Sequence, residues 1–187
     1  MYIYDTVTKV DQPLLVITGG FVHTTCINWS SNGWIYFHHF PDAQIWKIKS
    51  NGDSLTQVTK DVMEKHDFTF NKDGSKMVIG GSITKYFVVM TDKNGNLLDT
   101  LNINGAKFSW SPDDSKILFQ GLDSSNDVVV GYYDLKTKIT HTVVDLTPLG
   151  FDGLSGLCWL SDSRNIIACS PTNMLFRVDS KTGMVTP

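Results

Sequence analysis

The chain has 187 residues, of which 41% are hydrophobic, 11% aromatic and 19% charged, and its formal net charge is −3. This length suits one ordinary domain, and the hydrophobic content is enough to bury a core. The mildly acidic balance argues against a nucleic-acid-binding protein, which needs a basic face to neutralise phosphates. No run of about eighteen apolar residues occurs, so the sequence predicts no membrane-spanning segment.

The first segment in chain order predicts a lone hairpin. Residues 2–9 and 13–18 are two apolar stretches that match the outer two strands of the repeat described below, with no inner strands beside them. An unpaired strand edge is a site for pairing or aggregation. The sequence leaves three arrangements open: a piece of a larger ring, self-association through the open edge, or closure of a small ring on the last repeat. The N-terminus lacks the basic and apolar regions of a signal peptide.

A unit of about 40 residues then recurs along the rest of the chain. In each copy an aromatic residue (Trp29, Phe70, Trp110 or Trp159) ends a short apolar strand, and a polar turn leads into a second strand. This period with all-strand content is typical of a β-propeller blade. The sequence therefore predicts an all-β fold, a single β-propeller domain of four-stranded antiparallel blades over residues 1–187. The expected division is a half-blade at 1–18 and blades at 25–59, 67–102, 105–145 and 154–187.

The recurring residues of the repeat are predicted to be structural. Each aromatic should pack between neighbouring blades and contribute on the order of 2–3 kcal/mol through burial. The turn aspartates Asp73, Asp113 and Asp162 should accept backbone hydrogen bonds within their own turns, so they are not a catalytic carboxylate cluster. Cys26, Cys158 and Cys169 are expected to be small buried thiols, with a Cys158–Cys169 bridge as the alternative.

The stretch Trp110-Ser111-Pro112-Asp113-Asp114-Ser115-Lys116-Ile117 resembles the W-S-P-D-G-x-x-I element of Tol-type (TolB-like) β-propeller repeats, and weaker copies lie at 70–77, 29–36 and 159–166. The resemblance implies a module that binds a protein or peptide partner, and a periplasmic or other extracytoplasmic location; without it, a cytoplasmic location is expected. The same repeat occurs in propeller domains of prolyl-oligopeptidase-like peptidases, whose catalytic triad lies in a separate domain. The WD-repeat alternative is weaker, because the Gly-His and Trp-Asp signature is missing.

A candidate binding face follows from the expected blades, because the loops between second and third strands and those between blades surround the mouth of the channel. Four of the five histidines fall in these loops. The residues expected to bind a ligand or partner there combine imidazole, carboxylate and aromatic groups: His23, His38, Phe40, Asp42, His66, Asp123, Phe151 and Asp152. No cofactor, metal ligand or catalytic residue is predicted, and the sequence contains no G-x-S-x-G, C-x-x-C or H-E-x-x-H motif.

Three functions remain open at this point. The first is a non-enzymatic interaction module that binds a protein or peptide at the channel mouth or at the exposed edge. The second is a carbohydrate-binding propeller that uses Trp34, Trp46, Phe40 and Phe151 as stacking platforms. The third is a metal-dependent enzyme built on His23, His66 and either His38 or His39.

Overall fold

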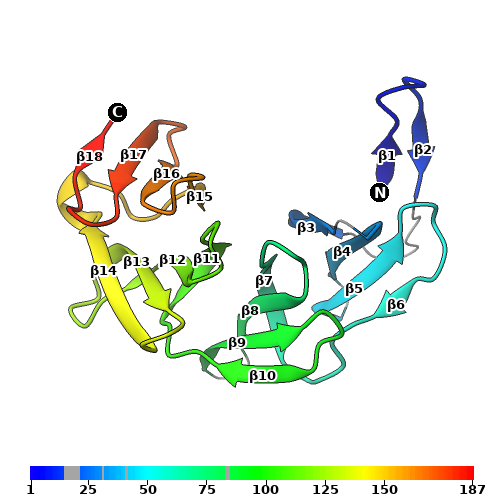
Figure 1. Ribbon diagram of the computed structural model, residues 1–187, viewed down its shortest axis with the longest axis horizontal. Helices are drawn as coiled ribbons and strands as arrows, with labels where there is room; N and C mark the ends of the chain where they lie inside the picture. Colours follow the sequence, from blue (N-terminus) through cyan, green and yellow to red (C-terminus); the bar gives the residue numbers. More distant parts are fainter. Residues whose placement is uncertain (15–21, 31, 41, 83–84) are drawn as a thin grey trace.

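The computed structural model describes residues 1–14, 22–30, 32–40, 42–82 and 85–187, with only the backbone described at 22–26. The predicted all-β propeller is confirmed: four four-stranded antiparallel sheets stand side by side as blades around a common axis (Figure 1). Within each sheet consecutive strands pair, and the first strand of each lies nearest the axis. Within the described residues, no helix is both long and apolar enough to cross a membrane.

The strands have the following bounds. A two-stranded hairpin opens the chain with β1 (Tyr2–Tyr4) and β2 (Asp11–Pro13). The first full sheet consists of β3 (Val22–Trp29), β4 (Trp34–His39), β5 (Gln44–Lys49) and β6 (Thr56–Gln57). The second consists of β7 (Glu64–Phe70), β8 (Lys76–Ser82), β9 (Tyr86–Asp92) and β10 (Leu97–Thr100).

The third sheet consists of β11 (Gly105–Trp110), β12 (Lys116–Leu122), β13 (Val128–Asp134) and β14 (Ile139–Asp145). A short 3-10 helix, η1 (Thr147–Leu149), precedes the fourth sheet. That sheet consists of β15 (Gly156–Trp159), β16 (Asn165–Cys169), β17 (Leu175–Asp179) and β18 (Val185–Thr186). The hairpin β1–β2 and the fourth sheet lie at the two ends of the resulting arc (Figure 1).

The core is a series of apolar layers between neighbouring sheets. Val78 and Val88 of the second sheet pack against Ile117 and Phe119 of the third, and Leu118 of the third packs against the layer that contains Ile166 of the fourth. A further layer joins the first and second sheets, and a smaller one joins the hairpin β1–β2 to the first sheet. Each sheet therefore depends on its immediate neighbours for burial, as in other repeat architectures.

Two of the four recurring aromatics fulfil the predicted packing fully, and one does not. Trp110 and Trp159 retain only 9% and 7% of their accessible surface, and the indole N–H of Trp110 donates to the Thr69 carbonyl of the preceding sheet at 3.3 Å. Phe70 is half-buried, with its ring centroid 4.6 Å from that of Tyr36. Trp29, however, is 60% exposed, so the prediction of burial is wrong there. Each aromatic packs on the sheet before it, and the sheet before Trp29 is the hairpin β1–β2, which packs on Ile35 and Phe37 of β4 and on Ile48 of β5 and leaves the Trp29 ring exposed.

The N-terminal hairpin has the same turn as two outer hairpins of the full sheets. The Lys9 N–H donates to the Asp5 carbonyl, as Lys138 does to Asp134 and Gly183 to Asp179. In all three turns the first carboxylate accepts the N–H groups two and three residues later, and the fifth residue has a positive φ, between 59° and 70°. The second strand of this hairpin lies at 11–13, before the 13–18 that the sequence predicts. Of that expected strand, residues 15–18 lie outside the described residues.

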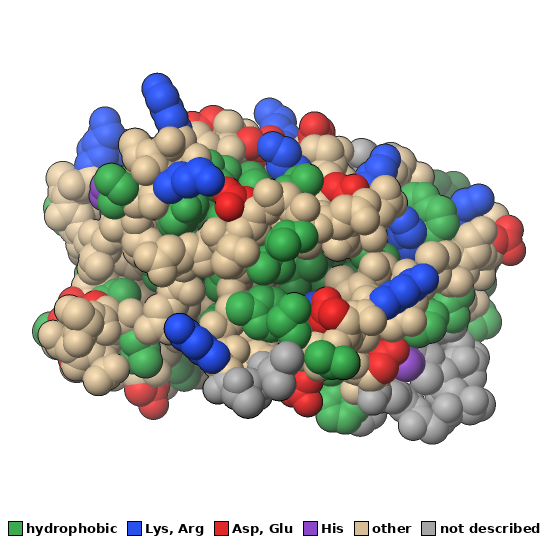
Figure 2. Space-filling model, turned by 90° about the horizontal axis from the view of Figure 1, so that it is seen from below, with side chains coloured by type: hydrophobic (Ala, Val, Ile, Leu, Met, Phe, Trp, Pro, Cys, Tyr) green, Lys and Arg blue, Asp and Glu red, His purple; other side chains and the backbone are tan. Residues whose placement is uncertain are grey.

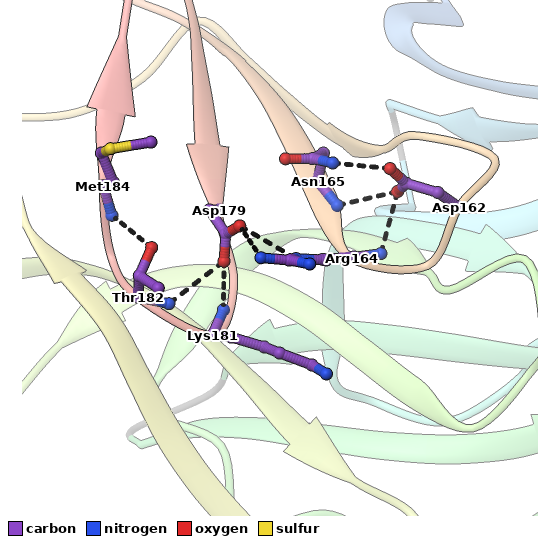
Figure 3. Close-up of polar contacts among 7 residues, drawn as sticks. All are labelled: Asp162, Arg164, Asn165, Asp179, Lys181, Thr182 and Met184. Carbon is purple, nitrogen blue, oxygen red and sulfur yellow. Dashed lines mark hydrogen bonds and ion pairs between the residues drawn. The ribbon is translucent and has the colours of Figure 1, made fainter.

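The turn aspartates act within their own turns, as predicted. Asp73 accepts from Ser75 N–H at 2.9 Å, and Asp113 accepts from the Ser111 hydroxyl at 2.6 Å. Asp162 accepts from the backbone N–H groups of Arg164 and Asn165, at 2.9 and 2.8 Å (Figure 3). These contacts lower the pKa of each carboxyl, for Asp162 to about 2. The three aspartates therefore stabilise turns and do not share a site.

We expect these turns to make the last sheet sensitive to acid. The hydrogen bond from Arg164, followed by that from Lys181 N–H, lowers the pKa of Asp179 to about 2 (Figure 3). Both folded pKa values lie below the ordinary value of 3.8, so their stabilisation is complete above that pH and is lost as the pH falls towards 2. In urea titrations between about pH 5 and pH 2, Asp162→Asn combined with Asp179→Asn should be less stable than the wild type at the upper pH. The two proteins should converge at the lower pH, and a constant difference would contradict the assignment.

The cysteines depart from the expected burial. Both described cysteine side chains are free thiols; Cys158 is exposed and Cys169 is half-buried, while the Cys26 side chain lies outside the described part. Cys158 pairs with Ile167 in the register of β15 and β16, and the neighbouring Trp159 faces the third sheet. Because side chains alternate along a strand, Cys158 faces the opposite side, where the described chain places no further sheet.

Charges on the rim are mixed. Figure 2 looks onto one outer side of the sheets, where basic and acidic side chains are interspersed and neither sign forms a continuous patch. This distribution agrees with the small net charge of −3. It gives no support on this side for a phosphate-binding surface, which requires clustered Lys and Arg.

Candidate functional site

A pocket of about 390 Å³, here called the axial pocket, lies between the inner strands of the second, third and fourth sheets. It is lined by groups from β7, β11, β15 and the residue before β15: His66, Asp67, Ala106, Lys107, Phe108, Ser155, Gly156 and Leu157. The lining thus combines both signs of charge, an imidazole, a hydroxyl and apolar side chains. Sites of this size and mixed lining are typical of ligand and peptide recognition.

Two β-bulges place the polar groups of this pocket. The pairing of β7 with β8 shifts between Lys65 and Asp67, which leaves His66 as the extra residue. The pairing of β11 with β12 shifts between Ala106 and Ser109, where Lys107 has a φ of 57°. A bulge redirects the side chain of the extra residue, and bulges are frequent beside functional sites. His66 and Lys107 therefore come to line one hollow although they lie on different sheets.

His66 is exposed and held by neighbours of its own sheet. Its Nε2 lies 2.8 Å from the Ser82 hydroxyl, and its ring stacks on Tyr86 with centroids 6.5 Å apart. The Tyr86 hydroxyl is buried and has no hydrogen-bond partner among the described residues. Burial, with a smaller effect of the Asp67 charge, raises the pKa of Tyr86 to about 12. Tyr86 therefore remains a neutral phenol at physiological pH.

Asp67 and Lys107 connect successive sheets near the axis. The Phe108 N–H of the third sheet donates to Asp67 Oδ2 of the second at 3.1 Å. The Lys107 ammonium donates to the Leu154 carbonyl, just before the fourth sheet. These bonds fix the spacing of the three sheets at the pocket, so its walls are pre-organised for a ligand.

A second group of candidates gathers in the turn between β4 and β5. Asp42 Oδ1 lies 2.9 Å from His39 Nδ1 and accepts from Gln44 N–H at 3.1 Å, while Oδ2 accepts from Trp46 Nε1 at 2.9 Å. Partial burial acts to raise the pKa of Asp42, but the hydrogen bonds from His39 and Trp46 outweigh it and the pKa is lowered. Phe40 projects from this turn and is half-exposed.

The remaining candidates are dispersed. His38 is buried in β4, and the backbone of His23 pairs with it, but the His23 side chain lies outside the description. Asp123 accepts from Ser125 and Asp127 N–H groups of its own loop, at 2.7 and 3.0 Å. Asp152 is exposed.

Phe151 belongs to a different hollow, of about 330 Å³, in the fourth sheet. Its ring stacks on Phe176 with centroids 5.4 Å apart and an interplanar angle of 6°. The lining is wholly apolar: Leu149, Phe151, Met174, Leu175, Phe176, Val185 and Pro187. The eight predicted residues thus do not form one site. Only His66 lines the axial pocket, and Asp67, Lys107, Phe108 and Ser155 of that pocket were not predicted.

The geometry gives less support to the carbohydrate-binding and metal-dependent alternatives. Trp34 packs on the layer towards the second sheet and Trp46 on the layer towards the hairpin, so these two rings do not form one stacking platform. The ammonium groups of Lys47 and Lys49 lie over the Trp34 ring, 5.0 and 5.7 Å from its centroid. Among the described residues, no three His, Cys, Asp or Glu side chains are close enough to hold a metal ion.

No protein-family profile matches the sequence, and no curated protein matches it. Solved structures do match. A TolB protein of Agrobacterium tumefaciens has a TM-score of 0.77 at 17% identity, over 98% of this chain and 67% of its own. A chain of a nidogen/laminin complex has a TM-score of 0.74 at 10% identity, over 96% and 68%. TolB of Acinetobacter baumannii has a TM-score of 0.61 at 16% identity, over 76% and 36%. The chain therefore has the fold of a TolB-like β-propeller.

Proposed function

We propose that this chain is a non-enzymatic binding module that takes an extended peptide segment of a protein partner into the axial pocket. The observation that carries the proposal is the convergence of His66, Lys107 and Phe108 on one pre-organised hollow lined by both charged and apolar groups. An extended peptide offers carbonyl acceptors, N–H donors and side chains that such a lining matches. Two similar structures are of protein complexes: the nidogen/laminin complex and the mitotic checkpoint complex, the latter with a TM-score of 0.62 at 14% identity over 87% of this chain and 48% of its own. Both support a binding role for this chain.

Selection of linear peptides from a displayed library against the whole chain tests this proposal. Affinities of the selected peptides should fall about tenfold or more in His66→Ala, because the imidazole's hydrogen bond to the peptide and its ring contact are both lost. Leu157→Asp, which places a carboxylate in the pocket, should weaken apolar peptides by a similar factor. His141→Ala is the matched control, since His141 lies on the outer strand β14 stacked against Tyr132.

Three results would count against this site. Equal affinity for the wild type, His66→Ala and Leu157→Asp would place the peptide elsewhere. Loss of binding in Phe151→Ala alone would assign it to the apolar hollow of the fourth sheet. Glycan-array binding without peptide binding would favour the carbohydrate alternative.

A further inference from the structure

One position of the repeat carries opposite charges in successive sheets. The residue three places before the recurring aromatic is Asp67 in the second sheet, Lys107 in the third and Gly156 in the fourth, and all three line the axial pocket. The residue that follows is apolar, as Phe108 and Leu157 are, because it contributes to the layers between sheets. Packing therefore explains the apolar position, but it does not explain a carboxylate in one copy and an ammonium in the next.

Hydrogen bonds hold these two charges on different walls of the pocket. Asp67 Oδ2 accepts from Phe108 N–H at 3.1 Å, across the boundary between the second and third sheets. The Lys107 ammonium donates to the Leu154 carbonyl, just before the fourth sheet. Within the described part of the chain, Asp67 and Lys107 do not form an ion pair with each other. A neutral amide also supplies both an acceptor and a donor, so these hydrogen bonds alone do not require the charges.

Lys107 stands at a position whose backbone favours a different residue. Its φ is 57°, a left-handed conformation that Gly and Asn adopt more readily than other residues. Such conformations persist where the surrounding structure enforces them, often at binding sites. The ammonium carries three N–H groups, of which the Leu154 carbonyl takes one. Its charge and its other donors are therefore placed for an anionic group.

The rest of the pocket sets the demands on a ligand. Ala106, Phe108 and Leu157 add apolar surface to the lining. The Asp67 carboxylate has about four acceptor sites, more than Phe108 N–H uses. A ligand that fills the pocket removes water from the carboxylate and from the ammonium, which is costly unless opposite charges replace that water.

We propose that the axial pocket recognises a peptide segment in which one cationic and one anionic side chain flank an aliphatic residue. The anion lies at Lys107, the cation at Asp67, and the aliphatic side chain on Phe108 and Leu157. This inference rests on the proposed function, because it names the chemistry of the peptide that the pocket takes. Segments with two like charges are excluded, since each places like charges together at one wall.

The probes are four fluorescently labelled peptides that differ only in charge. Their central sequences are Lys-Leu-Glu, Gln-Leu-Glu, Lys-Leu-Gln and Gln-Leu-Gln, within identical Gly-Ser flanks. The ends are acetylated and amidated, so the charges come from the side chains alone. Both backbone directions satisfy the proposed arrangement, and the peptides are therefore compared by charge content and not by charge order.

Each charge of the pocket is removed separately in the whole chain. Asp67→Asn keeps an acceptor for Phe108 N–H, and Lys107→Asn suits the left-handed backbone. Asp99→Asn and Lys138→Asn are the matched controls. These two residues form an ion pair at 2.8 Å outside the pocket, and Lys138 has a φ of 59°, close to that of Lys107. Circular dichroism should show all four variants folded.

The wild type should bind the Lys-Leu-Glu peptide at least about tenfold more tightly than either singly charged peptide. In Lys107→Asn, replacement of the peptide's Glu by Gln should no longer change the affinity, whereas replacement of its Lys should still cost about tenfold. Asp67→Asn should show the converse, and the two controls should behave like the wild type. This crossed pattern isolates the two charge pairs, because a general folding defect weakens all four peptides alike.

Several results would overturn the proposal. They are equal affinity of the wild type for all four peptides, no binding of the Lys-Leu-Glu peptide at about 1 mM, and uniform losses in Lys107→Asn and Asp67→Asn. Library-selected peptides distinguish this failure from that of the proposed function. If they still lose affinity in His66→Ala while the four probes bind alike, the pocket binds peptides without recognising their charges.

Discussion

Trp110→Ala should destabilise the chain by about 3–5 kcal/mol, whereas Trp29→Ala should change its stability by about 0.5 kcal/mol or less. The two residues occupy the same position of the repeat, but Trp110 is 9% exposed and Trp29 is 60% exposed. Truncation of Trp110 also removes the donor to the Thr69 carbonyl and opens a cavity between the second and third sheets. Urea unfolding followed by far-UV circular dichroism measures both free energies.

Trp159→Ala serves as the positive control, because Trp159 is 7% exposed in the next interface. The free energy of unfolding should fall by about as much in Trp159→Ala as in Trp110→Ala. A cost of several kcal/mol for Trp29→Ala would mean that another part of the chain covers this ring in solution. It would contradict the 60% exposure of Trp29 seen here.

The same comparison shows what the repeat could and could not predict. The period and the turn chemistry depend on local sequence, so Asp113 and Asp162 were correctly assigned to turns and the four-stranded sheets followed. Burial depends on the neighbouring sheet, which the repeat does not specify. Trp29 occupies the same repeat position as Trp110, but the hairpin before it packs on β4 and β5 and leaves the Trp29 ring 60% exposed.

The axial pocket escaped prediction for a different reason. His66 and Lys107 face it because each is the extra residue of a bulge, and a shift of one residue exchanges the two faces of a strand. No local motif marks these bulges. The loop aspartates follow a known tendency, however: Asp in a loop often accepts the N–H two residues later in an Asx turn, as Asp42 and Asp123 do. Their carboxylates were therefore already engaged by their own loops.

A glycine cradle around Phe119 should be a stringent packing constraint in the third sheet. A Cβ at Gly131, the residue directly opposite Phe119, would lie 2.7 Å from the Phe119 ring, and a Cβ at Gly105 would lie 2.6 Å from it. The aromatic ring thus covers glycines on both neighbouring strands, a known way to stabilise glycine within a sheet. We expect Phe119→Ala to cost about 3–5 kcal/mol, through lost burial and an unfilled cavity.

Gly131→Ala tests the cradle through coupling. Alone it should cost about 1–3 kcal/mol, because the new methyl group meets the ring and the His141 carbonyl, 2.9 Å away. In a Phe119→Leu background the ring is gone, so the added methyl group should cost less than in the wild type. A double-mutant cycle in urea measures the difference, with Gly156→Ala as the control, since a Cβ there makes only an ordinary contact at 3.9 Å. Strict additivity would show that the backbone, and not the Phe119 ring, excludes side chains at position 131.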